Sequence, residues 1–106
     1  MGMSYKYSGS ASYPRFSLEF GVIAEYFFGG IPYRDDDGWL KYTFPANIDF
    51  YLEEWFNHRY EQRTYLETLA IWEEIKKYPE IKDWSPQIWH ELEKSIALGD
   101  GWDICQ

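Results

Sequence analysis

Residues 85–99 carry a complete set of helix signals and constrain the fold more than any other part of the chain. Ser85 is a typical N-cap residue, Pro86 suits the first helical turn, and Gly99 suits the left-handed position that follows a helix. Between them an apolar stripe recurs at helical spacing, formed by Ile88, Trp89, Leu92 and Ile96. The sequence therefore predicts a helix over residues 86–98 that lays one face against a core.

Residues 46–78 are also strongly helical, but one straight helix does not fit them. A first apolar face consists of Ile48, Leu52, Trp55 and Phe56, and a second consists of Tyr65, Leu66, Leu69 and Trp72. In an unbroken helix the second face would be rotated by roughly 100° from the first. Thr64 and Glu67 have the spacing of a capping box. We therefore expect a break between Asn57 and Thr64, giving two helices or one kinked helix that Pro79 ends.

Residues 17–28 fit either a helix or a buried strand, and we favour the helix. Two of their stripes have helical spacing, one made of Leu18, Val22 and Tyr26 and the other of Phe20, Ile23 and Phe27. Ser17 would be the N-cap, and Gly29-Gly30 would stop the helix. Residues 31–44 then predict a hairpin that turns at Asp36-Asp37-Gly38, because Asp tolerates and Gly favours a positive φ.

The two ends of the chain complete the expected fold. Residues 1–14 are rich in Gly, Ser and Tyr and fit a loose arm or an edge strand equally well. Trp102 and Ile104 indicate a C-terminal tail that packs on the body. A chain of 106 residues has room for one domain, residues 1–106. The expected class is α+β: an N-terminal arm or short strand, a helix, one β-hairpin, and two to three packed helices.

Aromatic side chains make up 22% of the chain, which is more than a core of this size can bury completely. Tyr and Trp combine an apolar ring with a polar group and are therefore common at protein interfaces. The sequence predicts an aromatic-rich core with some exposed rings, or else an aromatic recognition surface.

The net charge of −8 restricts the partners that suit this chain. Proteins that bind nucleic acid or anionic membranes need an excess of Lys and Arg, so direct binding of either is disfavoured. Basic proteins are favoured, including proteins that themselves handle nucleic acid. The single cysteine, Cys105, favours a reducing compartment, and no apolar stretch approaches ~18 residues. We expect a location in the cytoplasm of a bacterial host.

The acidic residues are concentrated in the second half of the chain. Residues 1–46 have a net charge of −1, whereas residues 47–106 have 13 acids against 6 bases. One interpretation is that acidic helices occupy a partner's phosphate-binding site. The other is a solvated face with its own ion pairs, such as Arg63–Glu67 and Glu73–Lys77. The candidate partner-binding residues are Asp35, Asp36, Asp37, Trp39, Asp49, Glu53, Glu54, Glu61, Glu67 and Glu74.

No motif in the sequence indicates a metal site, a cofactor or catalysis. Asp35-Asp36-Asp37-Gly38 lacks the alternating ligands and the closing Glu of a calcium loop. His58, His90 and Cys105 do not have the spacing of zinc ligands. No nucleophile elbow, P-loop or dinucleotide fingerprint is present. We therefore expect a protein that is not an enzyme and that uses neither metal nor cofactor.

In general character the chain is similar to two groups of small acidic inhibitors. One is the anti-CRISPR type of phage counter-defence protein, and the other is the immunity proteins that neutralise nuclease toxins. The similarity is one of composition, so it assigns no residue roles. It implies a non-enzymatic inhibitor that binds a nuclease or defence complex. Reversing the charges of Glu54 and Glu61, or of Glu67 and Glu74, is expected to abolish inhibition with little effect on thermal stability.

A structural or assembly subunit is the alternative from a different class. A homodimer held through Trp39, Trp84 or Trp102 would favour it, because large apolar rings are common at the centre of interfaces.

Overall fold

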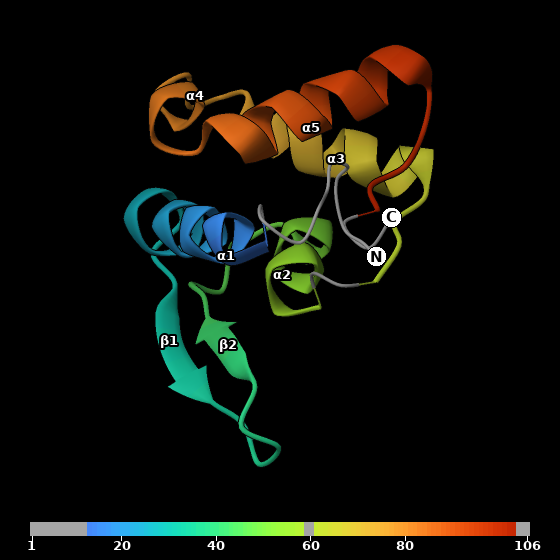
Figure 1. Ribbon diagram of the computed structural model, residues 1–106. Helices are drawn as coiled ribbons and strands as arrows, with labels where there is room; N and C mark the ends of the chain where they lie inside the picture. Colours follow the sequence, from blue (N-terminus) through green and yellow to red (C-terminus); the bar gives the residue numbers. More distant parts are fainter. Residues whose placement is uncertain (1–12, 59–60, 104–106) are drawn as a thin grey trace.

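The helices of this protein form two layers, and a β-hairpin extends from the lower one (Figure 1). The computed structural model describes residues 13–58 and 61–103. In chain order the elements are α1 (Tyr13–Val22), the π-helix η2 (Ile23–Phe27), β1 (Ile31–Arg34), β2 (Leu40–Thr43), α2 (Phe50–Asn57), α3 (Tyr65–Ile75), α4 (Ile81–Trp84) and α5 (Pro86–Leu98). The α+β class and the order of its parts are confirmed. The one-turn helix α4 is an addition to the expected elements.

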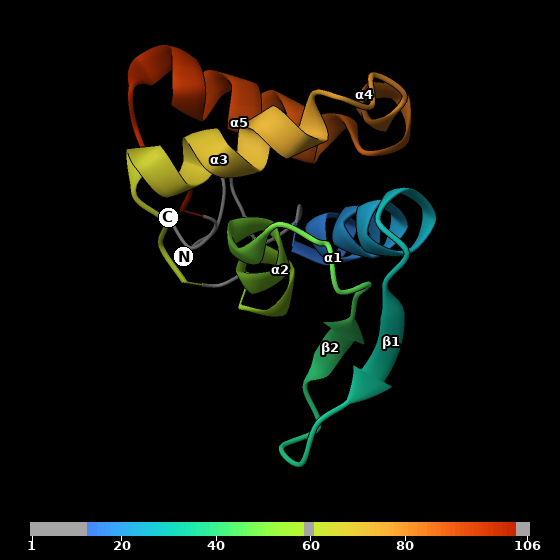
Figure 2. The same ribbon diagram turned by 180° about the vertical axis from the view of Figure 1, so that it is seen from behind.

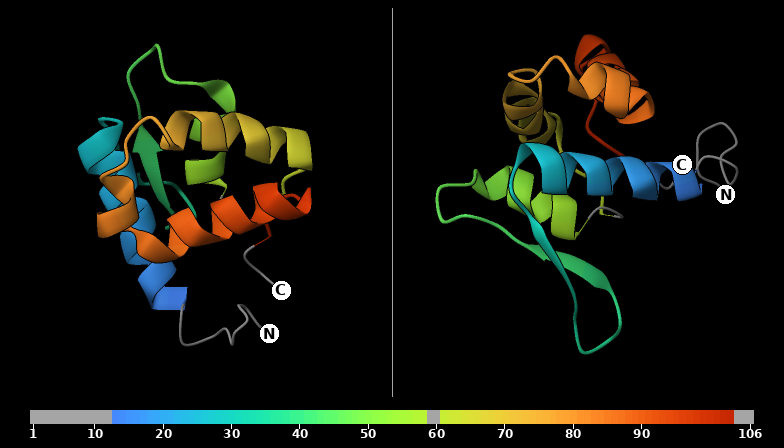
Figure 3. Two further views of the ribbon diagram at one scale, coloured as in Figure 1. Left: turned by 90° about the horizontal axis from the view of Figure 1, so that it is seen from above. Right: turned by 90° about the vertical axis from the view of Figure 1, so that its left-hand side faces the viewer.

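The layers are formed by α1 and α2 below and α3, α4 and α5 above, as the view from behind also shows (Figure 2). Helix α3 packs along α5 and also contacts α2, while α1 contacts α5. Seen from above, α3 and α5 run side by side over the lower helices (Figure 3). The core therefore lies between the two layers.

Residues 17–28 are helical, so the favoured interpretation of this segment is confirmed. The helix begins at Tyr13 rather than after Ser17, since Pro14 is well placed in a first turn. It continues as the single π-turn η2 and stops at Gly29, whose φ is 72°. In one apolar stripe Phe20 and Ile23 are fully buried and Phe27 is half-buried, whereas Leu18 and Tyr26 of the other stripe are exposed. Only the face of α1 and η2 that carries Phe20 and Ile23 therefore packs against the core.

The first expected element, an arm or strand over residues 1–14, lies outside the described residues up to position 12. Tyr13 and Pro14 belong to α1. Ile104 in the tail also lies outside the described residues.

The hairpin has the predicted turn. Strands β1 and β2 pair antiparallel with Tyr33 opposite Lys41, and Gly38 takes a φ of 85°. The Asp35 carboxylate organises the turn, because its Oδ1 accepts hydrogen bonds from the backbone N–H groups of Asp37 (3.0 Å) and Trp39 (2.9 Å).

The break between α2 and α3 and the capping box after it are confirmed. Thr64 Oγ1 accepts from the Glu67 N–H, and the Glu67 carboxylate accepts from the Thr64 N–H. The α2 face with Leu52, Trp55 and Phe56 is buried as predicted.

The predicted apolar face of α3 is wrong. The fully buried residues of this helix are Thr68, Ile71 and Ile75, whereas Leu66 is 73% exposed. Tyr65, Leu69 and Trp72 are half-buried. Because α3 lies between α2 and α5, its buried face is set by both neighbours rather than by the densest apolar stripe.

Helix α5 has its predicted bounds, but Ser85 does not cap it with its side chain. Its Oγ donates instead to the backbone carbonyl of Glu19 (3.1 Å). The cap comes from α1: Glu19 Oε1 accepts a hydrogen bond from the Ile88 N–H (2.9 Å). At the other end Gly99 is left-handed, with a φ of 71°, as predicted.

The centre of the core is a group of contacting rings. Phe20 lies 4.8 Å from Trp55 and 6.1 Å from Trp102 between ring centroids, and Trp55 lies 5.4 Å from Trp102. These edge-to-face arrangements are favourable for aromatic pairs. Trp102 is only 2% exposed, so the expectation of a packed tail is confirmed at this residue.

The tail is held by backbone as well as by its ring. The Trp102 N–H donates to Thr68 Oγ1 (2.8 Å), and the Arg63 N–H donates to the Trp102 carbonyl (2.9 Å). A Cβ on Gly101 would overlap the backbone carbonyl of Arg63, so only glycine permits this close approach. Within the part of the chain that the structure describes, no helix has both the length and the apolar character needed to span a bilayer.

Candidate functional site

A pocket of about 240 Å³ lies where β2 meets the C-terminal end of α2. Its apolar walls come from Trp39, Leu40 and Phe56, and Lys41, Asn57, His58 and Glu61 add polar groups. Trp39 is 60% exposed. A large exposed ring beside a pocket with several polar groups is typical of a binding surface.

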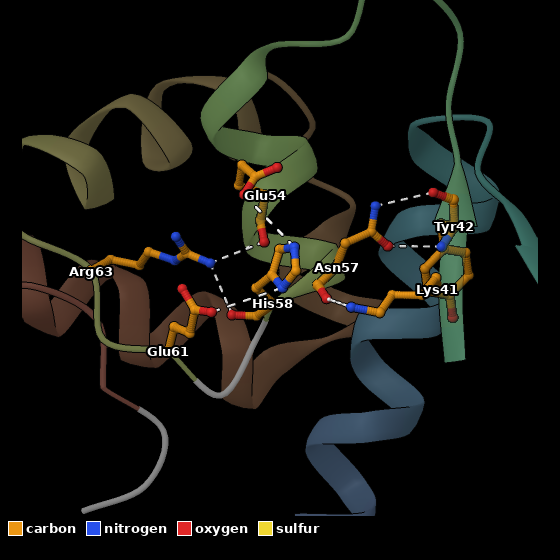
Figure 4. Close-up of polar contacts among 7 residues, drawn as sticks. All are labelled: Lys41, Tyr42, Glu54, Asn57, His58, Glu61 and Arg63. Atoms are coloured by element: carbon orange, nitrogen blue, oxygen red, sulfur yellow. Dashed lines mark hydrogen bonds and ion pairs between the residues drawn. The ribbon is translucent and has the colours of Figure 1, made fainter. Parts of the chain in front are cut away.

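Asn57 joins the hairpin to α2 at the base of this pocket (Figure 4). Its Nδ2 donates to the Tyr42 carbonyl (3.1 Å), and its Oδ1 accepts from the Tyr42 N–H (2.8 Å). The Lys41 ammonium donates to the Asn57 carbonyl (2.7 Å). The amide thus pairs with the free edge of β2 as a neighbouring strand would, and it holds the hairpin in place against the helices.

His58 stands between two carboxylates at the end of α2 (Figure 4). Its Nε2 is 3.8 Å from Glu54 Oε1, and its Nδ1 is 3.9 Å from Glu61 Oε2. Arg63 donates from one guanidinium nitrogen to the backbone carbonyls of Glu54 (3.0 Å) and His58 (2.9 Å). A cation at the C-terminal end of a helix satisfies its last carbonyls and opposes its dipole.

The outer face of the hairpin carries three exposed apolar or aromatic side chains. Alternation along the strands places Ile31, Tyr33 and Trp39 on one face together with Lys41 and Thr43, and we call the first three residues the hairpin face. They are 67%, 48% and 60% exposed. Tyr42 lies on the opposite face and is buried against the body. The side view shows the hairpin reaching well beyond the helices (Figure 3).

The edge of β1 is less suited to binding than this face. Both backbone polar groups of Tyr42 turn toward Asn57, so Pro32–Tyr42 is a non-hydrogen-bonded pair. Ile31 and Tyr33 then direct their N–H groups toward β2, and Pro32 has none. Only Arg34 presents a backbone donor outward, so an added strand would find few donors. A partner would therefore contact the side chains of the hairpin rather than add a strand to its edge.

The structure brings some of the predicted site residues together and separates others. Trp39 and Glu61 line one pocket, and Glu54 joins Glu61 through His58. The exposed carboxylates of Asp36 and Asp37 lie at the hairpin tip, next to Trp39 in the chain. The hairpin face, Asp36, Asp37, Glu54 and Glu61 together are called the hairpin surface below.

The other predicted acids are partly engaged within the molecule. The Asp35 carboxylate organises the turn, and Glu67 caps α3. Asp49 caps α2 by accepting from the Tyr51 N–H (3.2 Å). Glu53 is half-buried in the first turn of α2.

The ion pairs differ from those expected in their partners and in their spacing along the chain. Among the described residues the Lys pairs are Lys76–Glu73 and Lys77–Glu74, both at 3.1 Å and three residues apart. Arg63 binds backbone carbonyls instead of Glu67, because Glu67 is used by the capping box.

A second pocket, of about 360 Å³, lies between the end of η2, the loop before α2 and the end of α3. Its walls include Phe27, Phe28 and Tyr78, and two of the predicted acids, Asp49 and Glu74, also line it. The sequence does not indicate these rings as a group, because they come from distant segments that only the fold brings together.

Within residues 13–58 and 61–103, no group of three His, Cys, Asp or Glu side chains could hold a metal ion. No protein-family model matches this chain, and neither does any curated protein or solved structure.

Proposed function

We propose that this chain is a binding protein whose hairpin surface docks onto a basic, nucleic-acid-handling protein and blocks it. The observation that carries the proposal is the position of Trp39. Its ring is 60% exposed and lines a pocket together with His58 and Glu61. The exposed carboxylates of Asp36 and Asp37 come shortly before it in the hairpin turn.

The physical argument combines an aromatic anchor with surrounding charge. Trp and Tyr supply most of the binding free energy at many interfaces when they become fully desolvated. Carboxylates around such an anchor attract Lys and Arg and speed the encounter, and they discriminate against acidic partners. Asn57 and the Asp35 turn support the hairpin, so less conformational entropy is lost on binding.

A protein that binds phosphates presents the cationic groups that this surface fits. We therefore propose a defence complex as the target, which makes the chain a phage counter-defence inhibitor acting in the bacterial cytoplasm. A nuclease toxin is the alternative target, and the chain is then an immunity protein. Both targets require the same surface.

The test is an inhibition assay against purified CRISPR effector complexes and purified nuclease toxins. One of them should lose nucleic-acid binding or cleavage when the chain is added in equimolar amount. Trp39→Ala should weaken inhibition by about 30-fold, the effect of losing an interface anchor. Glu61→Lys should weaken it by about tenfold.

The matched control is Glu93→Lys, which makes the same charge change on the exposed side of α5. It should inhibit as well as the wild type. Glu67→Lys is unsuitable, because Glu67 caps α3 and its reversal costs about 1 kcal/mol of stability. The sequence-based expectation for that reversal is therefore revised. Inhibition that survives both Trp39→Ala and Glu61→Lys would exclude the hairpin surface.

An assembly subunit is the second candidate, supported by the exposed rings of Trp39 and Trp84 (65%). Trp102 is unable to contribute, because it is buried in the core. A dimer in light scattering that Trp84→Ala converts to a monomer would favour this candidate.

A further inference from the structure

We infer that the second pocket is a site for an alkylammonium group, and that its occupant is a lysine side chain of a partner protein. None of its residues lines the pocket beside Trp39. The assignment to a partner's lysine rests on the proposed function, whereas binding of the ammonium group does not.

Three aromatic rings meet at this pocket. The centroid of the Tyr78 ring is 5.3 Å from that of Phe28 and 5.9 Å from that of Phe27. The Phe28 and Tyr78 rings are nearly perpendicular, at 88°. Rings set at an angle form a corner, which suits a compact cation better than a flat one. Aromatic pockets of this kind bind alkylammonium groups through the negative faces of the rings.

Two carboxylates give the pocket its charge. Asp49 and Glu74 line it, and both are half-buried, so solvent screens them less than a fully exposed pair. Among the described residues, the engaged oxygens are Asp49 Oδ1, which accepts from the Tyr51 N–H, and Glu74 Oε2, which pairs with Lys77. No lining residue among those described is basic.

Lys77 shows what the site attracts. Its ammonium lies 3.1 Å from Glu74 Oε2, 60% of its side chain is exposed, and it is not one of the residues that line the pocket. It competes with an incoming ammonium for the same carboxylate. Removing its charge should therefore strengthen binding.

The experiment uses Nα-acetyl-lysine methylamide, which keeps the side-chain ammonium, as the probe. It is titrated into the full chain, and binding is followed by amide chemical shifts. The shifts should localise to residues around Tyr78 and Asp49. Asp49→Asn removes the charge while keeping an N-cap residue, and it should weaken binding by about fivefold. Tyr78→Leu removes the ring and should also weaken binding by about fivefold.

Two further variants separate binding at this pocket from partial unfolding and from a general effect of negative charge. Lys77→Gln should tighten binding by about threefold, a gain that partial unfolding is unable to produce. Glu73→Gln removes a neighbouring charge that pairs with Lys76, and it should leave binding unchanged. Equal weakening by Glu73→Gln and Asp49→Asn would overturn the site.

Changing the chemical structure of the probe tests which of its groups is bound. N-acetyl-norleucine methylamide has no ammonium, and binding equal to that of the lysine probe would overturn the inference. An absence of shifts at tens of millimolar would overturn it as well. Binding of n-butylammonium without binding of the lysine probe would overturn the lysine assignment. Because no arm contains Trp39 variants or the inhibited protein, these outcomes are independent of the hairpin surface.

Discussion

A single buried carboxylate links the beginning of the described chain to its last helix. Glu19 on α1 is only 5% exposed, and its side chain accepts the Ile88 N–H at the start of α5. Its backbone carbonyl accepts from Ser85 Oγ. Nothing in the sequence distinguishes Glu19 from the other 17 acids, because its role depends on a contact across 69 residues.

Removing this carboxylate should destabilise the protein. Glu19→Ala leaves the Ile88 N–H buried without its acceptor, so the free energy of unfolding should fall by about 1–3 kcal/mol. Urea denaturation measures the loss. Glu19→Gln retains an acceptor oxygen and should lose less. The exposed neighbour Glu25 is the control, and Glu25→Ala should change stability by no more than about 0.5 kcal/mol. Equal losses for Glu19→Ala and Glu19→Gln would contradict the capping role.

At the scale of elements, the hairpin depends on α2 for its stability. An isolated two-stranded hairpin is marginal in water, and both strands here have only four residues. Asn57 supplies two hydrogen bonds to β2 that a third strand would otherwise provide. The position of the hairpin therefore depends on Asn57, a residue outside the hairpin.

Asn57→Ala should loosen the hairpin while leaving the upper helices intact. Hydrogen exchange of the Tyr42 amide should accelerate by about tenfold, because its acceptor is lost. Amides of α3 and α5 should keep their protection. Asn47→Ala changes an exposed amide in the loop before α2 and should leave the Tyr42 exchange rate unchanged. Unaltered Tyr42 exchange in Asn57→Ala would show that other contacts hold the hairpin.

The elements also show which features are predictable from sequence. The hairpin turn, the capping box at Thr64 and the stop at Gly99 depend on neighbours within a few residues, and all three are as predicted. The cap of α5, the buried face of α3 and the role of Asn57 depend on residues far away in the chain. Both pockets also depend on residues far apart in the chain. Trp39 and four acids that line the pockets or pair with His58 were nevertheless predicted as partner-binding residues: Asp49, Glu54, Glu61 and Glu74.

At the scale of the whole molecule, the net charge of −8 attracts or repels other molecules at long range. The helix caps and ion pairs that some of the acids form act only at short range. Glu67 and Asp49 hold helix ends, and Glu73 and Glu74 have Lys partners. These engagements leave the net charge at −8, because that value already counts every Lys and Arg. A basic partner is therefore attracted before any contact forms.

Association with the inhibited protein should slow steeply as salt is added. The association rate constant should fall by about tenfold between low and physiological ionic strength, because salt screens charges beyond a Debye length. Stopped-flow measurements over a salt series give the slope. The dissociation rate constant should change much less. A rate constant of association that does not depend on salt would leave the acidic residues as a solvated face only.

The burial of Trp102 has a consequence for the timing of folding during synthesis. Phe20 and Trp55, which pack against it, leave the ribosome well before it does. Until residue 102 follows them, the rings at the centre of the core remain in contact with water or with chaperones. Completion of the core is thus delayed until translation has passed this residue.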